Sequence, residues 1–374
     1  MGRTPWSAAD AVVGLCRLLQ LLVRWNEERV LGDPRGPGGP PHILCRILDC
    51  KAKEAALGGS TAKRLSTPAP APGFRSAIVV QMLSRRTVLL APSAALAAPS
   101  TKMQLCLHQT TSAAAGYRRS LEGYAKAGIR YVEVIPPQLQ EFVKTDGMPA
   151  AKRLLSDLGL KAVSSSGVRG LAEPSPGRAK VLESLKSTVE MVAALGVDRM
   201  VCPCAASEKY TLDDYKRAQD NLREAGEIVK PYGVVAMLEF MRASTFVGTL
   251  PTSLNLTRDT AHPNIKSMFD FYHFWSGLSK FEDLELIRPG EIPHVHFQDV
   301  PKIPRELLDN TTRDIPGDGV SPLVRILQAL KKKGYSGPLS VELFYPRLQK
   351  GDPYEVAVEI RRKAEPILRQ AGVA

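Results

Sequence analysis

The chain has 374 residues, of which 44% are hydrophobic and 24% charged, enough for one large domain with its own core and an additional segment. Its formal charge of +12 is unevenly spread, because residues 1–102 contain 14 Lys and Arg against 6 Asp and Glu, which leaves 36 against 32 for the rest. The excess lies where no fold is expected, so the composition argues against nucleic acid as a partner.

Residues 1–81 show no alternation of strands and helices. Two stretches within them, 32–41 and 66–73, are rich in Pro, Gly and Ala. Such composition cannot bury enough apolar surface to offset the entropy of folding. We therefore expect residues 1–81 to be a disordered extension, or upstream sequence assigned to the protein by a wrong start.

Residues 82–100 have the pattern of a signal segment. Arg85 and Arg86 precede a short apolar run and then small residues up to Ala98. This order is typical of a secretory signal and resembles the twin-arginine type. We expect Met82 to be the true start, with an exported or periplasmic protein if the signal is used and a cytoplasmic one otherwise. The apolar run is too short for stable membrane insertion.

From residue 103 onward, strand patterns alternate regularly with helix patterns. Strands are expected at residues 103–108, 131–135, 160–166, 199–204, 234–240, 265–271, 293–298 and 339–344. Helices are expected at residues 113–127, 138–158, 178–195, 212–232, 251–260, 280–287, 322–333 and 353–370, and several end at a glycine. Eight such units predict an α/β fold, a (β/α)8 TIM barrel over residues 103–374. An open doubly wound sheet is the alternative, although no glycine-rich phosphate loop follows the first strand.

The seventh expected strand carries three polar side chains on one face. Because side chains alternate along a strand, His294, His296 and Gln298 point one way and Val295 and Phe297 the other. Two imidazoles and an amide facing a common space are typical of a ligand-binding or metal-binding strand.

Three other expected strands end in a carboxylate: Glu239, Asp270 and Glu342. A carboxylate at the end of a buried strand is costly unless a cation lies beside it. In a barrel the carboxyl ends of all strands meet at one mouth, so these three acids should converge with His296. Such a set favours one divalent cation: Mn²⁺, Mg²⁺, Co²⁺ or Zn²⁺. Glu239 and Glu342, on strands that are not neighbours, would flank a substrate and exchange protons with its carbon atoms.

Five motifs resemble those of the xylose isomerase-like barrel superfamily. They are Leu-Glu239-Phe, Asp270-Phe-Tyr-His273, His294-Val-His296-Phe-Gln-Asp299, Arg313-Asp-Ile-Pro-Gly317-Asp-Gly319 and Val-Glu342-Leu. The family includes sugar phosphate isomerases and epimerases, and the tail after Glu342 looks most similar to that of its 2-keto-myo-inositol isomerase members.

The resemblance implies a role for each matching residue. Glu239, Asp270, His296 and Glu342 would bind one divalent cation, and the two glutamates would be catalytic. His273 and Arg313 would bind substrate oxygens, and Gln298, Glu133, His108 and Trp275 are further candidates for substrate binding. We interpret His294 as a buried supporting imidazole rather than a metal ligand.

The expected function is a metal-dependent isomerase or epimerase that acts on a sugar, sugar phosphate or keto-polyol through an enediolate. A dehydratase of the 3-dehydroshikimate dehydratase type is the main alternative, and a sugar-binding barrel without activity is another. An endonuclease IV-like DNA repair enzyme is disfavoured because it needs a trinuclear zinc cluster with more histidines than this sequence offers. Barrels of this kind often pair, so a homodimer is compatible with the sequence.

Overall fold

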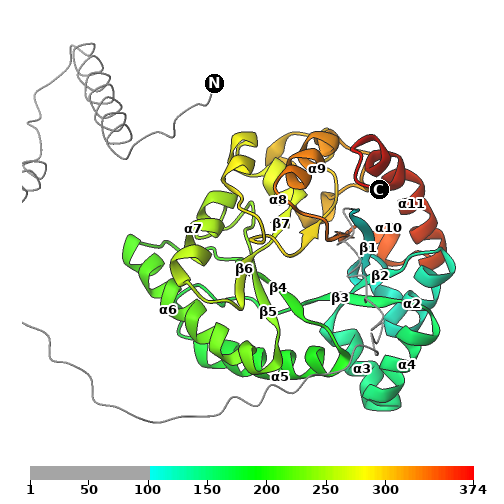
Figure 1. Cartoon of the computed structure of the whole chain (residues 1–374), viewed down its shortest axis with the longest axis horizontal. Helices are drawn as coiled ribbons and strands as arrows, with labels where there is room; N and C mark the ends of the chain where they lie inside the picture. The colour runs from blue at the N-terminus through cyan, green and yellow to red at the C-terminus, as the bar shows by residue number, and fades with distance from the viewer. Residues whose placement is uncertain (1–101) are drawn as a thin grey trace, which may run out of the picture. The chain divides into compact units, whose positions relative to one another are not determined.

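The computed structural model describes residues 102–374, which form a nearly closed parallel barrel surrounded by helices (Figure 1). The strand order is β6-β5-β4-β3-β2-β1-β9-β8-β7. The strands are β1 (Gln104–His108), β2 (Tyr131–Val134), β3 (Lys161–Ser166), β4 (Arg199–Pro203), β5 (Val235–Glu239), β6 (Ile265–Ser267), β7 (Phe269–Asp270), β8 (Val295–His296) and β9 (Pro338–Val341). The two strands at the ends of this order, β6 and β7, are separated by a single residue, so the sheet curves round until its edges meet and the predicted barrel is confirmed over an open sheet.

The sixth expected strand is interrupted. β6 pairs with β5 and β7 pairs with β8, so the two edges of the sheet belong to one stretch of chain broken at Met268. The expected end at residue 271 was wrong, because Phe271 already begins helix α8 (Phe271–Ser276). The carboxylate of Asp270 accepts a hydrogen bond from the backbone N–H of His273, and such a cap favours the start of a helix over continuation of the strand.

Helices cover the outside of the ring (Figure 1). They are α2 (Gly116–Lys126), α3 (Pro136–Asp146), α4 (Met148–Asp157), α5 (Arg178–Leu195), α6 (Leu212–Val229), α7 (Leu250–Thr260), α9 (Leu323–Lys332) and α11 (Pro353–Gln370). The short α10 (Pro346–Gln349) is drawn on the inner side of α11 in Figure 1. The single helix expected at 138–158 was wrong, because Gly147 adopts a φ of 81° and separates α3 from α4. The helix expected at 280–287 is a 3-10 helix, Phe281–Leu286.

The inside of the barrel is apolar on one side and polar on the other. Val201, Met237 and Met268 form a small apolar cluster from β4 to the break after β6. On the opposite side, the buried inward residues include Glu133, Ser164, His294 and Ser340. Hydrogen-bonding side chains therefore fill part of the barrel core and can support a polar site above it.

Two expected segments, residues 1–81 and 82–100, lie outside the described residues, so the extension and the signal stay predictions. Within residues 102–374, no helix has both the length and the apolar character needed to span a bilayer.

Candidate metal and active site

Four side chains from four parts of the barrel meet at the carboxyl ends of the strands. Glu239 ends β5, Asp270 ends β7, His296 ends β8 and Glu342 follows β9. Each offers one ligand atom, and these atoms lie within 4.8 Å of one another. Nδ1 of His296 is 3.2 Å from Glu239 Oε1, 3.5 Å from Asp270 Oδ2 and 3.4 Å from Glu342 Oε2. The structure thus brings together all four residues that the sequence suggested as metal ligands.

The charges in this cluster suit a divalent cation. Burial raises the pKa of Glu239 to about 7, and the nearby Asp270 and Glu342 carboxylates act in the same direction. Burial acts to lower the pKa of His296, but Glu342 and the other surrounding carboxylates outweigh it and hold the pKa well above the ordinary value. Three buried carboxylates and one imidazole are a donor set that suits a hard or borderline divalent ion. The residues present therefore fit such an ion.

Arg313 lies directly against two of these carboxylates. Its Nη1 donates to Glu342 Oε2 at 2.5 Å and to Asp270 Oδ2 at 3.3 Å. Burial acts to raise the pKa of Asp270, but His273 and Arg313 outweigh it and hold that pKa well below its ordinary value. The guanidinium and two acids therefore form one buried, charged unit at the mouth of the barrel.

A hydrogen-bond donor of another residue faces each ring nitrogen of His273. Its Nε2 is 3.0 Å from Arg313 Nη2, and its Nδ1 lies 3.3 Å from the backbone N–H of Arg242. Burial lowers the pKa of His273 to about 4, so the ring is neutral and can accept at only one nitrogen. A substrate oxygen between His273 and Arg313 could accept from both, which agrees with the oxygen-binding role expected for this pair.

Glu133 lies behind His296. Its Oε2 accepts from His294 Nε2 at 2.8 Å and from His296 Nε2 at 3.2 Å, and its Oε1 accepts from Ser164 Oγ at 3.3 Å. A carboxylate that binds the far nitrogen of a histidine orients the ring and makes it a better metal ligand. Glu133 is fully buried and its hydrogen-bond partners are two imidazoles and Ser164, so the substrate contact expected from the sequence stays a prediction. The interpretation of His294 as a supporting imidazole agrees with its place beside Glu133.

The remaining candidates lie at different distances from the cluster. Gln298 donates to Asp270 Oδ2 at 2.6 Å, so it holds a candidate ligand in place. His108 Nε2 lies 3.6 Å from Glu342 Oε1 and therefore borders the cluster. Trp275 packs in a separate small apolar cluster, and stacking on a sugar ring stays a prediction for it.

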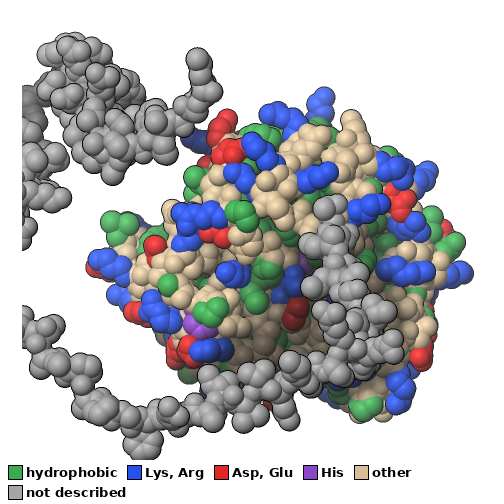
Figure 2. Space-filling model, viewed as in Figure 1, with side chains coloured by type: hydrophobic (Ala, Val, Ile, Leu, Met, Phe, Trp, Pro, Cys, Tyr) green, Lys and Arg blue, Asp and Glu red, His purple; other side chains and the backbone are tan. Residues whose placement is uncertain are grey.

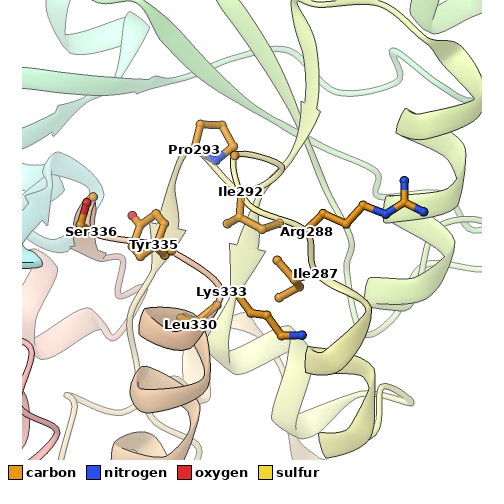
Figure 3. Close-up of a pocket in the computed structure, with 11 residues that line it drawn as sticks. Ile287, Arg288, Ile292, Pro293, Leu330, Lys333, Tyr335 and Ser336 are labelled. Atoms are coloured by element: carbon orange, nitrogen blue, oxygen red, sulfur yellow. The ribbon is translucent and has the colours of Figure 1, made fainter. Parts of the chain in front are cut away.

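The hollow in the middle of the face in Figure 2 contains charged side chains. A different pocket, of about 190 Å³, is lined by Ile292, Pro293, Leu330 and Tyr335 together with Arg288 and Lys333 (Figure 3). Because Pro293 precedes β8 and Ser336 and Gly337 precede β9, this pocket lies at the amino ends of the strands. TIM-barrel active sites lie at the carboxyl ends, so the four-residue cluster is the candidate active site.

Known proteins share this fold and sequence pattern. Residues 121–364 match the family described as xylose isomerase-like TIM barrel. An inosose isomerase of Halalkalibacterium halodurans is 30% identical over 250 residues, which span 65% of this chain and 89% of that relative. A 3-dehydroshikimate dehydratase of Pseudomonas putida is 28% identical over 242 residues, which span 63% of this chain but 37% of the relative.

Among solved structures, the IOLI protein with a binding zinc atom superposes with a TM-score of 0.68 and 25% identity, covering 72% of this chain and 99% of that one. Together with the strand-end motifs, these matches confirm the resemblance seen in the sequence. The chain belongs to the xylose isomerase-like TIM barrel family.

Proposed function

We propose that the protein is a divalent-metal-dependent isomerase or epimerase whose substrate is a keto-polyol of the inosose type. The convergence of Glu239, Asp270, His296 and Glu342 within 4.8 Å carries this proposal, because it combines a cation site with two glutamates on separate strands. The similarity to an inosose isomerase along most of that relative supports the choice of substrate class.

In this proposal each group of residues has a separate role. The four converging side chains would hold the cation, which would supply positive charge where negative charge develops as a proton leaves carbon. Glu239 and Glu342 remove the proton and return it to the neighbouring carbon in an isomerase or to the opposite face in an epimerase. Arg313 and His273 donate hydrogen bonds to substrate oxygens and fix the carbon that loses its proton.

A dehydratase is the second candidate, because a 3-dehydroshikimate dehydratase is also similar over most of the barrel. It would use the same proton removal beside a ketone and then expel a neighbouring hydroxyl as water. The two functions differ in product, since loss of water gives a conjugated compound that absorbs ultraviolet light.

The test is incubation of protein loaded with Mn²⁺, Co²⁺ or Zn²⁺ with 2-keto-myo-inositol and with 3-dehydroshikimate in deuterated water. We expect deuterium at a carbon beside the ketone of 2-keto-myo-inositol, seen by NMR, together with a new keto-inositol isomer. A new, longer-wavelength ultraviolet absorption band from an aromatic product of 3-dehydroshikimate, without exchange into 2-keto-myo-inositol, would select the dehydratase. Binding without exchange into either compound would reject both.

The matched variants are Glu342→Gln and Glu359→Gln. Both remove one carboxylate charge, but Glu359 lies on the outer helix α11 and pairs with Arg347. Exchange should be lost in the Glu342 variant and kept in the Glu359 variant.

A further inference from the structure

Asp299 has an unusual set of partners just beyond β8. Its Oδ1 accepts backbone N–H groups from Val300 at 2.8 Å and Ser321 at 2.9 Å. Its Oδ2 accepts those of Gly317 and Gly319, both at 3.1 Å. Only 1% of this residue is exposed, so one buried carboxylate is satisfied entirely by backbone donors, three of them from a single distant loop.

The same loop begins beside Arg313. The backbone N–H of Asp299 donates to the carbonyl of Asp314 at 2.9 Å, and the N–H of Asp314 donates back at 3.1 Å. A Cβ at Gly319 would lie 2.3 Å from the Val300 carbonyl oxygen and 2.6 Å from Asp299 Oδ1, so the loop packs directly on this carboxylate. The chain therefore leaves the site after Gln298 and comes back to it at Arg313. The segment that follows Arg313 is held there by its hydrogen bonds to Asp299.

We propose that Asp299 is a positioning residue that fastens residues 314–321 and thereby holds Arg313 against Asp270 and Glu342. An amide at this position has one acceptor oxygen, and its NH₂ group would face two backbone N–H donors. The charge and both oxygens of Asp299 are thus needed to keep the loop closed. The effect on substrate binding rests on the proposed function, whereas the fastening of the loop does not.

The first test compares Asp299→Asn with Asp318→Asn. Asp318 lies in the same loop, but its carboxylate is 38% exposed and pairs with Lys363 Nζ on α11 at 2.6 Å. Hydrogen exchange followed by mass spectrometry should show the amides of Gly317, Gly319 and Ser321 exchanging about tenfold faster or more in the Asp299 variant, as expected for the loss of a charge-assisted hydrogen bond. The Asp318 variant should exchange like the wild type.

Arginine modification reports on Arg313 itself without any substrate. The residue is only 3% exposed, so phenylglyoxal should leave it unmodified in the wild type and in the Asp318 variant. It should modify Arg313 in the Asp299 variant, as seen by peptide mapping. Protection of Arg313 in a folded Asp299 variant would overturn the proposal, and so would rapid exchange of the three loop amides in the wild type, a measurement that needs no variant.

A double-mutant cycle separates positioning from general stability. With 2-keto-myo-inositol as substrate, Asp299→Asn should raise KM, and it should add little to the effect of Arg313→Gln, because both changes remove the same interaction. Independent, additive effects would show that Asp299 does not act through Arg313. Absence of turnover in the wild type would instead count against the proposed function, and the exchange and modification results would still decide the role of Asp299.

Discussion

Replacement of Glu133 by Gln should weaken metal binding although Glu133 is not expected to touch the metal. Its Oε2 accepts from the Nε2 atoms of His294 and His296 at 2.8 and 3.2 Å. Removal of a carboxylate that orients a metal-binding imidazole typically lowers metal affinity by about 10- to 100-fold. Loss of one partner from a buried charged network also destabilises a protein by about 3 to 5 kcal/mol. Calorimetric titration with Mn²⁺ or Zn²⁺ and urea denaturation measure the two effects.

Glu173→Gln is the matched control. Glu173 is a second buried glutamate, 6% exposed, and its Oε1 accepts a hydrogen bond from the Cys204 thiol at 3.1 Å. Among residues 102–374, none of its hydrogen-bond partners is an imidazole. The control should keep metal affinity within about twofold of the wild type. If Glu133→Gln also binds metal like the wild type while it remains folded, the supporting role assigned to Glu133 is refuted.

Three further predictions concern the site and the outer surface. Glu342→Gln should lower turnover by roughly three powers of ten or more, since it removes both a proposed metal ligand and a proposed proton carrier, and rates measured at saturating metal would test this. In chelator-treated protein the pKa of Glu239 is raised to about 7 and that of His296 is held well above its ordinary value. Below pH 7 the metal must therefore displace one proton from each, and calorimetry should show affinity falling about a hundredfold per pH unit from pH 7 to pH 5. Arg347 and Lys363 lower the pKa of Glu359 to about 2. The contribution of Glu359 to the free energy of unfolding is therefore full above pH 4.5 and is lost as the pH falls toward 2. Glu359→Gln should lower the melting temperature at pH 7 and have little effect on it at pH 2.

The alternation of strand and helix patterns predicted the barrel correctly, because each pattern depends only on residues that are neighbours in the sequence and can be read without the tertiary structure. Alternation along β8 and glycines at helix ends are visible in the sequence. The exceptions arise where a local signal competes with another. Gly147 ended a helix that periodicity had continued, and the Asp270 carboxylate capped a helix where a strand was expected.

The convergence of strand-end residues also followed from the sequence, because a barrel places the carboxyl ends of all strands at one mouth. Glu133 shows the limit of that reasoning. The register between β2 and β3 shifts at Val132/Glu133, which sets Glu133 opposite Ser164. No sequence pattern marks that shift, so the contact of Glu133 with Ser164 was not foreseen, and its contacts with His294 and His296 were not foreseen either.

The sequence by itself therefore determined the eightfold strand and helix pattern and the acids and histidine at the strand ends. Only the tertiary structure decided which groups contact one another. Glu133 accepts a hydrogen bond from His296, Arg313 donates to the carboxylate of Glu342, and Asp299 accepts from the backbone of the loop that contains Gly319. The physical reason is that periodicity is a property of adjacent residues, whereas a hydrogen bond joins groups that come within about 3 Å only after the barrel has closed.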